Sequence, residues 1–289
     1  MNRPLFLLLL TGAALGLNFP LGKLALAGGI QPALWAAWIC LAAGLTMQLV
    51  SAALERSAPA PPMLRYAFIS GFLSYVAPNF LTYLVIPKIG SGLAAIMFAL
   101  SPVTTALLSL ALKVRPPSAL GLTGIAVGLA GALIIIFRRN ADFGGGAHWL
   151  LLAVLIPVFL GIGNVYRTLA WPNGAGPMRL ASRTNLAAAP ILLAIDLALT
   201  GGLDLAPLAA HPGLAVLQIA VSTCMFLMFF RLQQLGGPTY LSQIGYVAAV
   251  VGVGLGVFYF GETYPATVWV GAAVVAAGVA LTTCSQFRQ

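Results

Sequence analysis

The 289-residue chain is 61% hydrophobic and 7% charged, with a mean hydropathy of +1.01. A water-soluble protein of this length could not remove so much apolar surface from solvent, so the composition excludes a soluble enzyme or binding domain and indicates an integral membrane protein. The formal net charge of +9 comes from cations scattered singly along the chain, which argues against nucleic acid as a partner.

Ten apolar stretches follow one another, each near the length of about 20 residues that a helix needs to cross a bilayer. Clusters of Gly and Pro separate them and supply turns. The pattern predicts an all-α integral membrane protein with ten transmembrane helices. We place these helices at 4–27, 32–53, 64–86, 91–112, 118–138, 147–170, 178–200, 212–234, 239–261 and 265–284.

The positive charges predict the orientation, because cytoplasmic loops are enriched in Lys and Arg. With the N-terminus inside, ten of the 14 Lys and Arg lie at cytoplasmic helix ends, three lie at outer ends and Lys23 lies within the first helix. The outer Arg138–Arg139 pair runs against the rule, but the balance predicts that both termini are cytoplasmic. A cleaved signal peptide ending near Ala25-Leu26-Ala27 is the alternative for the first segment.

The first five stretches resemble the second five, which predicts two copies of one unit, at residues 1–143 and 144–289. A duplicated unit with an odd number of spans forms an inverted repeat, a symmetry that many secondary transporters use for alternating access. The matched residues are Asn18 and Asn164, Phe80 and Phe226, Gly90 and Gly236, and, in a second register, Gly121, Ala126, Gly128 and Ala130 with Gly271, Ala276, Gly278 and Ala280.

Several short motifs then point to a family. They are Gly245-Tyr246-Val247, Gly261-Glu262, Trp269-Val270-Gly271 and Ala277 to Leu281 in the second half, and Gly16-Leu17-Asn18-Phe19 with Lys23, Ser101-Pro102-Val103 and Gly121 to Gly131 in the first. Together they resemble the EamA repeat of the drug/metabolite transporter superfamily. The resemblance implies a bacterial inner-membrane permease, with export the commoner direction and a cavity lined mainly by the first, third, fourth, sixth, eighth and ninth helices.

The chain departs from the EamA pattern at two places. The first half has Lys113-Val114-Arg115 near the point where the second half has Gly261-Glu262, and the second half has Ala248 where Pro102 would align. Because the family's Glu stands at a helix end, we expect its loss from the first half to change a loop or a helix cap rather than transport chemistry.

The third helix carries the clearest candidate site. Tyr75, Asn79 and Tyr83 recur every four residues and so share one face. Phenol and amide groups are costly against lipid and useful against an amphipathic solute, so we expect this face to line a cavity. Hydrogen bonding to neighbouring helices is the alternative.

The second half supplies further cavity candidates. In the eighth helix Gln218, Ser222, Met225 and Phe229 share a face, although Met and aromatic residues at this spacing also suit simple packing. The ninth helix adds Ser242 or Gln243 together with Tyr246.

Asn18 and Asn164 occupy equivalent positions in the first helix of each half, so an inverted repeat would bring both near the membrane midplane. Structural hydrogen bonding is the alternative for both. Lys23 and Arg167 lie toward the far ends of the same two helices. They are candidates for anion recognition at the gates, unless they extend to the lipid headgroups.

Small residues mark the fifth and tenth helices as packing elements. Gly121, Gly124 and Gly128 in one, and Gly271 and Gly278 in the other, favour close helix association. The protein is expected to be a monomer or a homodimer.

Residue types that the apolar stretches lack reduce the number of possible functions. The five acidic residues are predicted to lie in loops or near helix ends, which argues against proton-coupled export of organic cations. The three cysteines fall in apolar stretches, and no cluster suits a metal or cofactor. We find no convergent nucleophile and base, so an enzyme is not expected. The sequence favours a transporter of a small polar or amphipathic metabolite, such as an amino acid, with lipid as its other partner. A channel or scaffold, and less so an intramembrane enzyme, are the alternatives.

Overall fold

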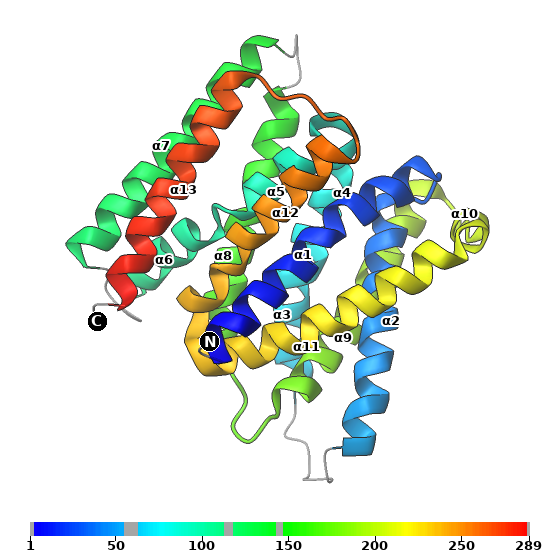
Figure 1. The fold of residues 1–289 in the computed structure, drawn as a ribbon. Coiled ribbons are helices and arrows are strands. Elements are labelled where there is room, and N and C mark those ends of the chain that lie inside the picture. Colours follow the sequence, from blue (N-terminus) through cyan, green and yellow to red (C-terminus); the bar gives the residue numbers. More distant parts are fainter. Residues whose placement is uncertain (1–2, 55–62, 113–117, 143–146, 288–289) are drawn as a thin grey trace.

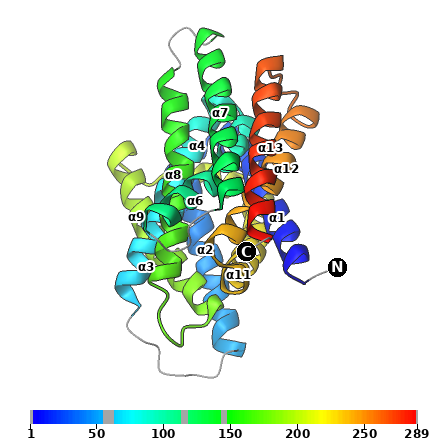
Figure 2. The same ribbon diagram turned by 90° about the vertical axis from the view of Figure 1, so that its left-hand side faces the viewer.

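A computed structural model describes residues 3–54, 63–112, 118–142 and 147–287, and these fold into helices joined by short connections (Figures 1 and 2). The helices, in chain order, are α1 (Arg3–Ala27), α2 (Pro32–Leu54), α3 (Leu64–Gly71), the π-helix η1 (Phe72–Val76), α4 (Ala77–Ile89), α5 (Ser91–Phe98), α6 (Ser101–Ala111), α7 (Ala119–Asp142), α8 (Ala147–Leu169), α9 (Pro177–Thr200), α10 (Ala206–Ala210), α11 (Pro212–Ser242), α12 (Ile244–Phe258) and α13 (Ala266–Phe287).

Seven helical segments in the described residues are long and apolar enough to cross a membrane. They coincide with seven of the predicted helices. The remaining three predictions, 118–138, 239–261 and 265–284, coincide with shorter apolar helices at Ala119–Gly131, Ile244–Phe258 and Ala266–Gly278. The all-helical prediction is thus confirmed, whereas the count of ten spans stays a prediction. The Lys113-Val114-Arg115 segment lies outside the described residues.

One predicted helix is divided within its bounds, and one predicted break is wrong. The stretch 91–112 is not one helix, because α5 ends at Phe98 and α6 begins at Ser101, with Pro102 in its first turn. Proline suits the start of a helix because its missing N–H needs no partner there. Conversely, the predicted break at Gly236–Pro238 does not occur, since α11 runs through it to Ser242. The chain turns instead at Gln243, where α12 begins.

The third predicted helix contains a π-helical turn, η1, between α3 and α4. Pro78 follows directly in the first turn of α4. Proline lacks an N–H and leaves the carbonyl of residue i−4, here Ser74, without its usual helical partner. A π-turn accommodates such a fault, and turns of this kind occur often at functional sites. The extra residue in the π-turn η1 changes the directions in which the side chains of Ser74 and Tyr75 point, compared with a regular α-helix.

The helices pack as a central bundle with one pair set apart (Figure 1). Within the bundle α1 packs on α11 and α12, α8 packs on α4 and α6, and α2 packs on α9. Figures 1 and 2 both show α1 and α8 running in opposite directions, so that their C-terminal ends lie at opposite ends of the bundle. The separate pair is α7 and α13, which pack mainly on each other.

Glycines bring α7 and α13 into backbone contact. A Cβ added at Gly278 would lie 2.6 Å from the carbonyl oxygen of Gly124 and 2.7 Å from the Cα of Gly128. A Cβ at Gly131 would lie 2.8 Å from the carbonyl oxygen of Gly271. Without a hydrophobic force between helices in lipid, such close packing is a main source of their association.

Gly278→Ala is expected to lower the free energy of unfolding by about 1–3 kcal/mol, because the new methyl group meets backbone atoms that cannot move aside. Thermal unfolding of the detergent-solubilised protein measures it. The matched control is Gly254→Ala in α12, where an added Cβ meets nothing within 4 Å and the higher helix propensity of Ala should leave stability unchanged or raised. Equal midpoints for the two variants would contradict the packing argument.

Candidate functional site

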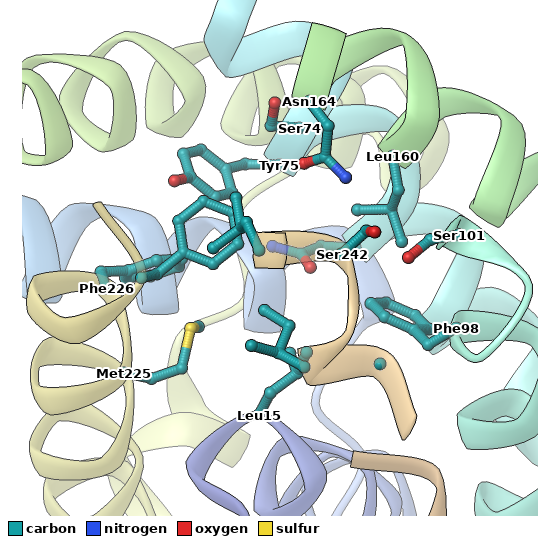
Figure 3. Close-up of a pocket in the computed structure, with 15 residues that line it drawn as sticks. Leu15, Ser74, Tyr75, Phe98, Ser101, Leu160, Asn164, Met225, Phe226 and Ser242 are labelled. Atoms are coloured by element: carbon teal, nitrogen blue, oxygen red, sulfur yellow. The ribbon is translucent and has the colours of Figure 1, made fainter. Parts of the chain in front are cut away.

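A cavity lies at the centre of the bundle, where the interrupted helices meet (Figure 3). Phe98 and Ser101 flank the α5–α6 break, and Ser242 and Gly245 flank the α11–α12 break. The other lining residues are Leu15, Ser74, Tyr75, Asn79, Leu160, Asn164, Met225, Phe226, Phe229, Leu241 and Ile244. Figure 3 shows Ser74 and Asn164 together on one side of the cavity, with Met225 and Leu15 across from them. Interrupted helices at a cavity are a feature of secondary transporters.

The cavity is small in this conformation. Its volume is about 50 Å³. On this measure one water molecule needs roughly 10–15 Å³, so the space holds a few waters. A solute much larger than a few waters would not fit in this space.

Two glycines allow the elements around the cavity to approach closely. A Cβ at Gly245 would lie 2.5 Å from the carbonyl oxygen of Phe98, so α12 can cross the α5–α6 break only with glycine at this position. A Cβ at Gly163 would collide with the Ser74 hydroxyl and lie 3.4 Å from the backbone of Leu73, so Gly163 lets α8 lie directly against η1.

A second, smaller cavity adjoins the first and is lined by Asn18, Asn79 and Tyr83, among others. Asn18 is held by α11: Gln218 Nε2 donates to its Oδ1 at 2.5 Å and Ser222 Oγ donates to the same oxygen at 3.3 Å. All three side chains are buried. Asn18 thus both lines the cavity and joins α1 to α11.

At the other side of the main cavity, Arg167 of α8 is almost fully buried, with 1% of its surface exposed. Its Nε donates to Gln233 Oε1 at 2.7 Å, its Nη2 donates to Asn164 Oδ1 at 2.5 Å and its Nη1 donates to Ser74 Oγ. The guanidinium also lies over the Phe229 ring, 4.9 Å from the centroid. Arg167 is therefore enclosed by side chains of η1, α8 and α11, whereas its position relative to the lipid headgroups stays a prediction.

The Arg167 cluster continues into α6. Asn164 Nδ2 donates to Thr105 Oγ1 at 3.2 Å, and Thr105 donates to the Ser101 carbonyl at 2.7 Å. Gln233 Nε2 also donates to the Asn164 carbonyl at 3.3 Å. Hydrogen bonds thus connect η1, α6, α8 and α11 around one cation.

A different cluster stands at the opposite end of the bundle. Lys23 Nζ of α1 lies 2.5 Å from Glu262 Oε1, in the connection between α12 and α13. The same oxygen accepts from the Ser91 amide at 2.9 Å, and Glu262 Oε2 accepts from the Gly92 amide at 3.0 Å and from the Tyr264 hydroxyl. Glu262 therefore caps the N-terminus of α5. The helix-end role expected of this Glu is present, but the capped helix belongs to the other half of the chain.

The surroundings of Glu262 stabilise its charge. Burial by itself raises the pKa of this carboxyl, but the hydrogen bonds from Lys23, from Tyr264 and from the amides of Gly92 and Ser91 outweigh burial. The net effect lowers the pKa from 4.5 to about 2. The carboxylate stays ionised at physiological pH and holds the first half against the second.

The predicted site residues divide into three groups: residues that line a cavity, one residue that supports the lining, and two residues that lie beside it. Tyr75, Asn79, Asn164 and Met225 line the main cavity, and Asn18 and Tyr83 line the smaller one. Ser222 supports Asn18 from behind the wall. Gln243 and Tyr246 lie beside the α11–α12 break but are not among the lining residues, where Ser242 stands instead.

Several lining residues were missed by the sequence analysis. Ser74 precedes Tyr75 and faces the cavity because the π-turn rotates it, a shift that a regular helical spacing does not reveal. Phe98 and Ser101 flank a break whose signal was Pro102. Gln233, which stands behind the lining, was not singled out either, because its contact with Arg167 depends on how α8 and α11 pack.

The arrangement is suited to binding rather than to bond-making chemistry. Its polar groups are hydroxyls, amides and one guanidinium, set among aromatic and aliphatic side chains. Within the described residues, no group of three or more His, Cys, Asp or Glu could hold a metal ion.

Comparisons with known proteins concern the family and the fold of the whole chain. The sequence profile of the EamA-like transporter family matches the chain twice, over residues 2–137 and 147–284. The inner membrane transporter YedA of Escherichia coli strain K12 is 28% identical over 233 residues, which cover 79% of this chain and 74% of YedA. A protein of known crystal structure aligns over 96% of each chain with a TM-score of 0.68 at 17% identity, a likeness of fold.

Glu262→Gln is expected to remove a stabilisation that depends on pH. Because folding lowers the pKa of Glu262 from 4.5 to about 2, the wild type gains stability from this group above pH 4.5 and loses the gain as the pH falls toward 2. Thermal midpoints of both proteins, measured from neutral to acidic pH, should differ most at neutral pH and converge below pH 4.5. Parallel curves would contradict the contribution of Glu262.

Proposed function

This chain belongs to the EamA-like transporter family, and from that premise we propose that it is a secondary transporter of the inner membrane. It moves a small polar or amphipathic metabolite, such as an amino acid, out of the cell by alternating access. The inner-membrane location rests on the apolar helices and on the name of the similar transporter YedA.

The observation that carries the proposal is the central cavity between two polar clusters. Asn18 and Asn164 line cavities from α1 and α8, and five and three residues further along these helices stand Lys23 and Arg167. Since α1 and α8 run in opposite directions (Figure 1), the step from Asn18 to Lys23 and the step from Asn164 to Arg167 lead toward opposite ends of the bundle. A carrier needs such an arrangement, in which contacts at either end can break separately.

The packing of the helices supports an inverted repeat of residues 1–143 and 144–289. In such a repeat the contacts of α1 should recur for its counterpart α8. The contacts of α1 with α11 and α12 have counterparts in the contacts of α8 with α4 and α6, while the pairs α2–α9 and α7–α13 each join equivalent helices. The peripheral position of α7 and α13 fits this scheme.

In this proposal, alternating access means that the Lys23–Glu262 cluster and the Arg167 cluster open in turn, so that one is closed while the other is open. Opening the bundle at one end separates Glu262 from Lys23, Ser91 and Gly92, while the Arg167 cluster stays closed. Opening at the other end breaks the contacts of Arg167 with Ser74 and Gln233 instead. With the N-terminus cytoplasmic, Lys23 and Glu262 form the outer closure and Arg167 belongs to the inner one.

Counterflow distinguishes a carrier from a channel or scaffold. A thermal-shift screen of metabolites identifies a solute that stabilises the purified protein, because selective binding favours the folded state. Proteoliposomes preloaded with that solute should then take up the labelled solute faster than empty ones. Uptake that does not respond to preloading would identify a pore and contradict the proposal.

Tyr75→Phe is expected to weaken transport without unfolding the protein. The Tyr75 hydroxyl is buried at the cavity and has no hydrogen-bond partner among the described residues, so its removal breaks no bond in the protein. If it binds the solute, the half-saturation concentration should rise by roughly fivefold, the equivalent of one hydrogen bond. Tyr259→Phe, at a residue that is 70% exposed, is the matched control. Wild-type kinetics for both variants would remove Tyr75 from the binding site.

A further inference from the structure

We propose that Arg167 anchors a carboxylate of the transported solute, so that the cargo is a carboxylate-bearing metabolite with a compact apolar body. This inference rests on the proposed function and names the substrate class for the same cavity.

The first argument is the charge balance around Arg167. A guanidinium with 1% exposure in the interior of a membrane protein has lost its hydration, a cost that a nearby anion normally offsets. No carboxylate among the described residues forms an ion pair with Arg167, and its hydrogen-bond acceptors Gln233, Asn164 and Ser74 are all neutral. By contrast, Lys23 at the other end has Glu262. The side chain of Arg167 is held in place, but its charge is not neutralised.

The second argument is the unused hydrogen-bonding capacity. A guanidinium has five N–H donors in a fixed fork that matches the two oxygens of a carboxylate. Three of these donors are used, one on each nitrogen. Nη1 and Nη2 therefore each keep one N–H for a further acceptor.

The third argument is the path from the cavity to the cation. Ser74, Asn164 and Phe229 each line the cavity and each contact Arg167. The guanidinium thus stands one side chain behind the wall, next to the polar side that Figure 3 shows at Ser74 and Asn164. A small rotation of Ser74 or Asn164, as the bundle opens, would let a carboxylate replace these neutral acceptors.

Two helix starts add to the positive potential. The first residue of α6, Ser101, and the first two of α12, Ile244 and Gly245, line the cavity. The N-terminal end of a helix carries a partial positive charge, which favours an anion nearby. The remaining walls, including Met225, Phe226 and Leu160, suit an apolar body.

Matched pairs of probes test the proposal on the wild-type protein. We would compare L-leucine, L-phenylalanine and isocaproate with their carboxamides, which have nearly the same shape and lack the negative charge. Thermal shift and competition for binding should respond to at least one carboxylate and weaken by at least about tenfold for its amide, as expected when a charge-assisted contact to Arg167 is lost. No response to any carboxylate, or an equal response to the amides, would overturn the proposal.

Substitutions then locate the anchor. Arg167→Gln should abolish the preference for carboxylate over amide, and Arg167→Lys should weaken carboxylate binding by about tenfold, because ammonium keeps the charge but lacks the fork. The control is Arg183→Gln, which removes an exposed cation from α9 and should keep the wild-type preference. A carboxylate preference retained in folded Arg167→Gln, or wild-type carboxylate affinity in folded Arg167→Lys, would overturn the assignment. If Arg167→Gln does not fold, Arg167→Lys and the wild-type pairs still decide it.

Failure of this inference is distinct from failure of the proposed function. Counterflow of a neutral amide with no response to carboxylates would keep the carrier and reject the anion site. Carboxylate binding that depends on Arg167, without counterflow, would keep the anion site and reject the carrier.

Discussion

The structure depends on one backbone crossing, where α12 begins against the break between α5 and α6. Gly245 permits it, because any side chain at this position would collide with the carbonyl oxygen of Phe98. The crossing brings together two places where regular helical hydrogen bonding is interrupted. Irregular backbone at this depth is tolerated only where protein or a cavity surrounds it. The cavity therefore lies where the α5–α6 and α11–α12 breaks meet, and residues beside both breaks line it.

Around that crossing, polar side chains occur in clusters that join different helices. Asn18 accepts from Gln218 and Ser222 across α1 and α11, and Asn164 bridges Arg167 and Thr105 across α8 and α6. Each isolated polar group would be costly in such an apolar interior, so their pairing restricts how the helices can pack. The clusters also explain why helices with mostly apolar surfaces pack in one arrangement rather than in several.

The two ends of the molecule place a cation in different surroundings, because Lys23 is partly exposed and Arg167 is buried. Lys23 is balanced by Glu262, and the carboxylate also satisfies the first amides of α5. Arg167 has neutral partners only, among the residues described. The two halves of the chain thus differ where charge is concerned, although α1 and α8 pack on comparable sets of helices. At one end the cation has an acidic partner, and at the other its partners among the described residues are neutral.

Sequence reasoning located much of the site but not its details. The spacing of Tyr75, Asn79 and Tyr83 indicated a polar face, and all three line a cavity. The same regular spacing could not place Ser74, because a π-turn shifts the register of the helix there. Turn propensity at Gly236–Pro238 predicted a break that α11 does not have, since tertiary packing can override a local preference.

Composition and periodicity by themselves determined that this is an all-helical membrane protein, because so apolar a chain must satisfy its backbone within helices. Small-residue motifs also determined the family resemblance. Only the tertiary structure decided which polar groups meet. Lys23 and Glu262 are far apart in the sequence, as are Ser74 and Arg167, and no local pattern contains such contacts. Pairings of this kind follow from helix packing, and they decide which charged side chains in the described residues meet an opposite charge.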